Sequence, residues 1–105
     1  MPCRGRRLSE PSTTDFASQL AEGRAQIDRI DQSIVALIAE RVRTGESLAA
    51  IKRAAGLAVL DPEREARVVR RAAELARSAG LPEEAIRDLY WRLIGLTRMV
   101  EHDGQ

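Results

Sequence analysis

The sequence predicts an all-α protein, and three observations lead to this prediction. The apolar residues are mainly Ala, Leu, Ile and Val, and only Phe16, Tyr90 and Trp91 are aromatic, which is typical of helix packing rather than of an aromatic-rich β core. Apolar positions recur at alternating spacings of three and four, the pattern of a helix packed against other helices. No stretch has the every-second-residue alternation of a half-buried strand.

The first and longest helix is predicted over about residues 15–55. No proline interrupts this stretch. The alternating apolar positions are Ile27, Ile30, Ile34, Leu37, Leu48 and Ile51. Gly56 and the short segment after it mark the first break in the helical pattern.

Two shorter helices are predicted over about residues 62–79 and 82–102. Asp61 is suited to cap the first of them, because Pro62 and Glu63 then occupy the first turn, where proline and acidic residues are favoured. Gly80 is the expected stop, and Pro82 opens the last helix.

The first helix is too long for a compact monomer of this size. About 40 residues at 1.5 Å each span roughly 60 Å, whereas a compact chain of 105 residues has a radius of gyration of only about 13 Å. We therefore expect an intertwined homodimeric helical bundle. The alternative is a break near Gly45 that folds the helix back on itself.

Composition excludes several classes of protein. The formal net charge of +1 argues against a strongly basic nucleic-acid-binding protein. One cysteine and one histidine cannot form the usual zinc sites or an intramolecular disulfide. No segment resembles a signal peptide or a membrane span, so we expect a cytoplasmic protein without membrane contact. We expect residues 1–14 to be a disordered tail, with a basic RNA-contacting arm as the alternative, and residues 15–105 to form one domain.

Charged residues occupy core positions of the first helix. After Leu37 the apolar pattern reaches Arg41, and the same stripe continues through Gly45 to Lys52, roughly 16 Å further along the axis. Lys52 is the only lysine beside sixteen arginines. A buried cation is costly unless an anion meets it, so this stripe favours an anion-binding site. The alternative is that Arg41 pairs with Glu46 or Glu65 and that Lys52 extends its ammonium to solvent.

The last helix also ends its apolar stripe in polar groups, Thr97 and Glu101. Fraying near the end of the chain is the alternative explanation for these two residues.

In their order and spacing, these residues resemble the all-helical, type II chorismate mutases. The resemblance covers about residues 20–101. Its motifs are Arg24 followed by Ile27-Asp28-Arg29-Ile30-Asp31, then Leu37-Ile38-Ala39-Glu40-Arg41, then Lys52 eleven residues later, and finally Asp61-Pro62-Glu63-Arg64-Glu65.

The resemblance implies a Claisen rearrangement of chorismate to prephenate that needs no metal or cofactor. Such an enzyme holds a dicarboxylate in a chair-like pose and stabilises the charge that develops at the breaking ether bond. By resemblance, Arg24 and Arg41 bind the two carboxylates and Lys52 donates to the ether oxygen. The remaining site residues would be Asp61 and Glu65 at the ring hydroxyl, Arg64 and Thr97 at a carboxylate, and Glu101 as a second donor to the ether oxygen.

Three expectations follow for individual residues. Arg24 lies twenty-eight positions before Lys52, or roughly 42 Å along one helix, so it would serve the site of the partner subunit. Glu101 must be protonated to donate a hydrogen bond, so we expect burial to raise its pKa. We expect Arg98, next to Thr97, to point outward, with an added contact to a substrate carboxylate as the alternative.

Two related functions and one unrelated function compete with this interpretation. An isochorismate-pyruvate lyase or a mutase for 4-amino-4-deoxychorismate could use the same scaffold, although the acidic pair Asp61 and Glu65 suits a ring hydroxyl. A helical dimerisation module without catalysis would explain the apolar stripe but not the cations that interrupt it.

Overall fold

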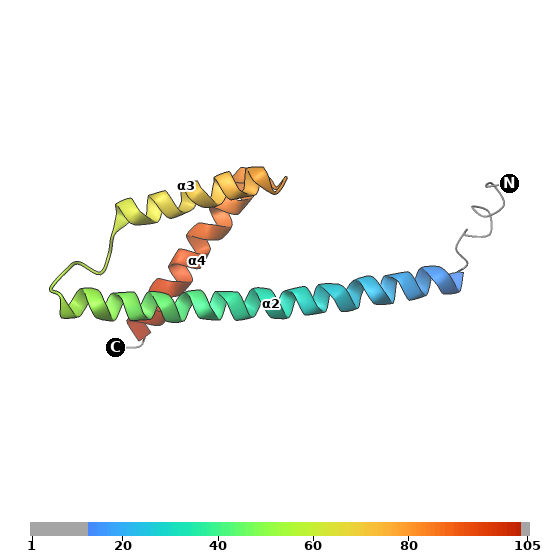
Figure 1. Ribbon diagram of the computed structural model, residues 1–105, viewed down its shortest axis with the longest axis horizontal. Coiled ribbons are helices and arrows are strands. Elements are labelled where there is room, and N and C mark those ends of the chain that lie inside the picture. Colours follow the sequence, from blue (N-terminus) through green and yellow to red (C-terminus); the bar gives the residue numbers. More distant parts are fainter. Residues whose placement is uncertain (1–12, 104–105) are drawn as a thin grey trace. The chain divides into compact units, whose positions relative to one another are not determined.

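The residues that the structure describes form three helices, which Figure 1 shows with their labels. The structure is a computed structural model that describes residues 13–103, with side chains described for residues 15–100. Its elements are α2 (Thr13–Ala54), α3 (Pro62–Ser78) and α4 (Glu83–Asp103), with no strand within the described range. The prediction of an all-α fold is confirmed, and each helix begins and ends within two residues of its predicted bounds. The predicted tail lies outside the described residues, apart from Thr13 and Thr14, which begin α2.

The chain divides by packing into two units, Met1–Ala36 and Leu37–Gln105. The first contains the N-terminal part of α2, on which Ile27, Ile30 and Ile34 are about half exposed. The second contains the rest of α2 together with α3 and α4. Because α2 is helical without interruption through residue 45, the alternative of a fold-back near that glycine is wrong.

Helices α2 and α3 end in the same way. Gly56 and Gly80 have φ values of 73° and 75°, a left-handed conformation that glycine adopts without steric cost. After each glycine a leucine N–H reaches back into the last turn: Leu57 donates to the Lys52 carbonyl, and Leu81 to the Ala76 carbonyl, both at 2.8 Å. This is the Schellman arrangement, which pairs carbonyls that would otherwise lack partners.

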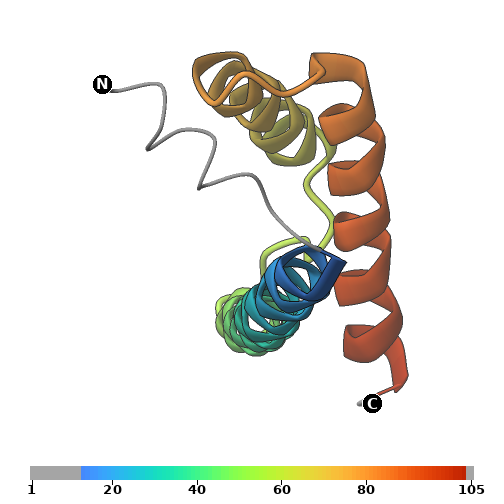
Figure 2. The ribbon, with the colours of Figure 1, turned by 90° about the vertical axis from the view of Figure 1, so that its right-hand side faces the viewer.

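Helices α3 and α4 pack against each other through small apolar side chains. The buried residues of these two helices are Val69, Ala72, Ala73 and Ala76 of α3 and Ile94 of α4. The two helices meet at their connecting turn and then diverge, so that α4 runs back to the C-terminal part of α2 (Figures 1 and 2).

An ion pair joins the two helices at that turn. Arg77 Nε donates to Glu83 Oε2 at 2.9 Å, and Arg77 Nη2 donates to Oε1 at 3.1 Å. The hydrogen bond from Arg77 lowers the pKa of the Glu83 carboxyl below its ordinary value, and the same bond raises the pKa of Arg77.

None of the described helices combines the length and the apolar character that a membrane crossing requires.

Candidate active site

A cavity of about 470 Å³ lies within the second unit, between the C-terminal part of α2, the loop before α3, and helices α3 and α4. This volume is within the range of small-molecule sites. Six of the eight predicted site residues line it: Arg41, Lys52, Asp61, Arg64, Glu65 and Thr97. Residues far apart in the sequence therefore meet in one cavity.

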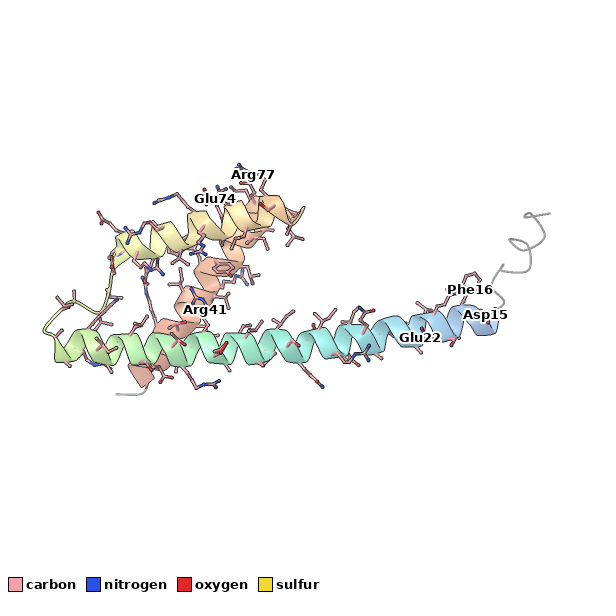
Figure 3. The ribbon with its side chains drawn as sticks, in the orientation of Figure 1. Asp15, Phe16, Glu22, Arg41, Glu74 and Arg77 are labelled. Carbon is pink, nitrogen blue, oxygen red and sulfur yellow. The ribbon has the colours of Figure 1, made fainter. Side chains whose placement is uncertain are left out.

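Arg41 is held on the side of α2 that faces α4 (Figure 3). Its Nη1 donates to Thr97 Oγ1 at 3.4 Å, and its guanidinium carbon lies 5.7 Å from the centre of the Tyr90 ring. The Thr97 hydroxyl in turn donates to the Leu93 carbonyl at 3.1 Å. The guanidinium is therefore oriented by one hydrogen bond and one cation–π contact, and its remaining N–H groups can bind an anion.

Lys52 is partly buried on the same face of α2, eleven positions after Arg41. Its ammonium donates to the Val59 carbonyl at 3.2 Å. This bond ties the loop between α2 and α3 to the helix. An ammonium has three N–H donors, so two remain for a ligand in the cavity.

Asp61 combines a helix cap with a place in the cavity wall. Its Oδ1 accepts a hydrogen bond from the Arg64 backbone N–H at 3.1 Å, which confirms the predicted N-cap of α3. The Asp61 carbonyl also accepts from the Glu65 N–H at 3.0 Å. The first turn of α3 thereby carries Asp61, Arg64 and Glu65 to the cavity together.

Arg98 does not point outward, and this expectation is wrong. Its side chain lines the cavity and forms a two-bond ion pair with Glu65 of α3: Nε donates to Oε2 at 3.0 Å, and Nη2 donates to Oε1. The divergence of α3 and α4 leaves the space that this pair spans. A sequence does not reveal such a pair, because its partners are thirty-three positions apart and on different helices.

Two predicted site residues are not tested by this cavity. Arg24 belongs to the N-terminal part of α2, is exposed, and does not line the cavity. Glu101 belongs to the last turns of α4, and its side chain lies outside the described part of the structure. The roles of all eight site residues stay predictions.

Sequence reasoning missed two contributors to the site, Tyr90 and the Val59 carbonyl. Tyr90 is seven positions before Thr97 on α4, so helical periodicity places both on one face, and this spacing was an available signal. The Val59 carbonyl is a backbone group whose direction depends on the loop, and no side-chain pattern indicates it.

The balance of charges favours an anionic ligand. Four cationic side chains (Arg41, Lys52, Arg64 and Arg98) and three anionic ones (Glu40, Asp61 and Glu65) line the cavity. Because Arg98 and Glu65 neutralise each other, Arg41 and Lys52 are available to bind carboxylates or other oxygen ligands.

Residues 23–102 of the chain match the family described as chorismate mutase type II. The chain is a member of this family. The match begins one residue before Arg24 and includes every predicted site residue. It confirms the resemblance drawn from the sequence motifs.

Several individual proteins are similar to this member of the chorismate mutase type II family, and their names agree with the family match. The chain is 40% identical over 65 residues to a chorismate mutase of Methanocaldococcus jannaschii, covering 62% of this chain and 66% of that protein. It is 31% identical over 86 residues to a bifunctional chorismate mutase/prephenate dehydratase of Aquifex aeolicus, and 29% identical over 88 residues to a T-protein of Enterobacter agglomerans. These two matches cover 79% and 84% of this chain but only 24% of each relative. No solved structure matches the chain.

Proposed function

We propose that this chain is a chorismate mutase that rearranges chorismate to prephenate. The observation that carries the proposal is the shared cavity, in which Arg41 and Lys52 of α2 lie with the acidic pair Asp61 and Glu65. Two cations suit a small dicarboxylate, and two carboxylates suit a ring hydroxyl.

The reaction is intramolecular, so the site has to position the substrate and stabilise charge rather than supply a nucleophile. The ether C–O bond of the enolpyruvyl group breaks while a new C–C bond forms to the ring, and both require a compact, chair-like substrate. Arg41, supported by Arg64 and Thr97, binds carboxylates. Lys52 donates to the ether oxygen, which gains negative charge as its bond breaks.

Two further groups complete the proposed site. Glu101, in its protonated form, is the second donor to the ether oxygen. Asp61 and Glu65 accept from the ring hydroxyl and so orient the ring.

A second copy of the chain supplies the remaining cation. The apolar stripe on α2 supports this part of the proposal, because Ile27, Ile30 and Ile34 remain about half exposed in a single chain. Covering them by another copy removes apolar surface from water at about 25 cal/mol per Å². In such a homodimer, Arg24 of each chain binds a substrate carboxylate in the site of the other chain.

Product analysis tests the proposal directly. Purified protein is incubated with chorismate, the loss of chorismate absorbance is followed, and the product is identified by mass spectrometry and NMR. We expect prephenate. Release of pyruvate from isochorismate, or turnover of 4-amino-4-deoxychorismate alone, would instead assign one of the related activities. If the protein does not consume chorismate, and chorismate does not raise the melting temperature of the protein, a dimerisation module without catalysis is favoured.

A further inference from the structure

The ion pair between Arg98 and Glu65 closes one wall of the cavity between α4 and α3. Two N–H groups of one guanidinium bind the two oxygens of one carboxylate, the geometry in which arginine binds carboxylates most strongly. The Glu65 side chain is 17% exposed and that of Arg98 is 48% exposed. The carboxylate is therefore the more deeply buried partner of the pair.

This pair changes what the Glu65 carboxylate can bind. Each oxygen already accepts one hydrogen bond from Arg98, and a carboxylate has about four acceptor positions in all. A neutral hydroxyl can still donate to one of the remaining positions. A cationic amine at the same place would also meet the guanidinium, a fixed positive charge that arginine keeps at every working pH.

We infer that Arg98 is a specificity-determining residue that makes this end of the cavity accept a ring hydroxyl and reject a ring ammonium. This inference rests on the proposed function, in which Glu65 faces the ring substituent. Like charges placed together are a common means of rejecting a wrong partner. Without Arg98, the freed carboxylate would attract an ammonium instead.

The experiment compares two substrates that differ only at this ring position, chorismate and 4-amino-4-deoxychorismate. The kcat/KM for each is measured near pH 6.5, where an aliphatic amine is protonated. We expect the wild-type protein to prefer chorismate. Arg98→Met is expected to lower the ratio of the two kcat/KM values by about tenfold or more, mainly because the amine becomes a better substrate.

Two control variants distinguish the effect of the charge at position 98 from the effect of the total charge of the cavity. Arg64→Met removes an equal charge from the same cavity wall, so it should slow both reactions but change the ratio by less than about threefold. Arg98→Lys keeps the charge and loses the two-bond geometry, and it should largely keep the wild-type ratio. A melting curve for each variant checks the fold, whose α3–α4 contact rests on buried apolar residues.

The experiment distinguishes a failure of the role of Arg98 from a failure of the proposed function. If the wild-type protein converts chorismate and Arg98→Met leaves the ratio within about twofold, the role of Arg98 is wrong while the proposed function stands. An equal shift of the ratio in Arg64→Met would also overturn the role of Arg98, because any cation of the cavity would then have the same effect on the ratio. If the wild-type protein converts no chorismate, the proposed function itself fails. Calorimetric titration with the two compounds as ligands then tests the role of Arg98 by binding alone: Arg98→Met should lower the preference for chorismate in the ratio of the two Kd values, and an unchanged ratio would overturn that role.

Discussion

At the scale of single residues, the cations of α2 are held by neutral groups and not by carboxylates. Arg41 donates to the Thr97 hydroxyl and lies over the Tyr90 ring, and Lys52 donates to the Val59 carbonyl. The alternative interpretation, in which Arg41 is oriented by an ion pair with Glu46 or Glu65, is therefore wrong: Glu65 pairs with Arg98 instead. Neutral partners fix the direction of a cation while leaving its charge for a ligand.

Loss of the single lysine should be the most damaging change to catalysis. We expect Lys52→Ala to lower kcat by about 100-fold or more, the usual effect of removing one donor to a developing oxyanion. Steady-state kinetics with chorismate measure this change. The neighbouring, exposed Arg53 provides the matched control, and Arg53→Ala should have little effect. A decrease below about tenfold for Lys52→Ala would contradict its assignment to the ether oxygen.

Glu101 should make the reaction depend on pH. An ionised carboxylate cannot donate a hydrogen bond, so the proposed role predicts that kcat falls as the pH rises and Glu101 loses its proton. Glu101→Gln keeps a donor at every pH and should flatten the pH–rate profile. A wild-type profile that is already flat from mildly acidic to basic pH would remove Glu101 from the mechanism.

At the level of single helices, the start of α3 and the ends of α2 and α3 are specified by local signals that the sequence carries. Asp61 caps α3 as its position before Pro62 predicts, and Gly56 and Gly80 end α2 and α3 in left-handed conformations. These motifs depend on neighbouring residues only, which explains why all three helices could be placed closely from the sequence.

Two Gly→Ala substitutions should have opposite effects on stability. Gly80→Ala forces a left-handed conformation on a residue with a Cβ, which costs about 1–2 kcal/mol, so the melting temperature should fall. Gly95 lies within α4, and a Cβ at this position meets no atom within 4 Å. Because alanine has a better helix propensity than glycine, Gly95→Ala should raise the melting temperature. Thermal unfolding followed by circular dichroism measures both. A stabilised Gly80→Ala would contradict the role of this glycine as the end of α3.

The ion pair at the α3–α4 turn should stabilise the fold in a pH-dependent way. Because Arg77 lowers the pKa of Glu83, the stabilisation is present above the unfolded-state pKa of about 4.3 and disappears as the pH falls through the lower folded-state value. Glu83→Gln should therefore lower the melting temperature at neutral pH, and the difference from the wild-type protein should narrow near pH 3.

Asp88, an exposed carboxylate on the same helix, gives the control for this measurement. Asp88→Asn removes the same charge without touching Arg77 and should change the melting temperature less. A Glu83→Gln difference that does not depend on pH would show that the ion pair is not its cause.

At the scale of the whole molecule, the proposed homodimer has sites that combine two chains. Arg24→Ala and Lys52→Ala should each be nearly inactive alone, since each removes one cation from every site. When the two variants are unfolded together and refolded, half of the dimers contain one chain of each kind. Each such dimer has one intact site out of two, so activity should return to about a quarter of the wild-type value.

Subunit mixing therefore separates a shared site from a site within one chain. If Arg24 serves its own chain, no combination of the two variants restores an intact site, and the mixture stays inactive. Size-exclusion chromatography with light scattering provides the companion measurement. A monomeric wild-type protein would contradict the homodimer.

The three helices, their caps and stops, and the stripe of cations on α2 could all be predicted from the sequence, because each depends on residues a few positions apart. The order and spacing of the motifs also predicted that the cations of α2 and the acidic residues at the start of α3 share a site, and both groups line the cavity. How those residues are held depends on contacts between segments far apart in the chain: the pairing of Arg98 with Glu65, the ring of Tyr90 beneath Arg41, and the Val59 carbonyl at Lys52. These contacts depend on how α3 and α4 diverge and on how a loop turns its backbone. Such geometry follows from packing between distant segments, and the periodicity of the sequence does not indicate it.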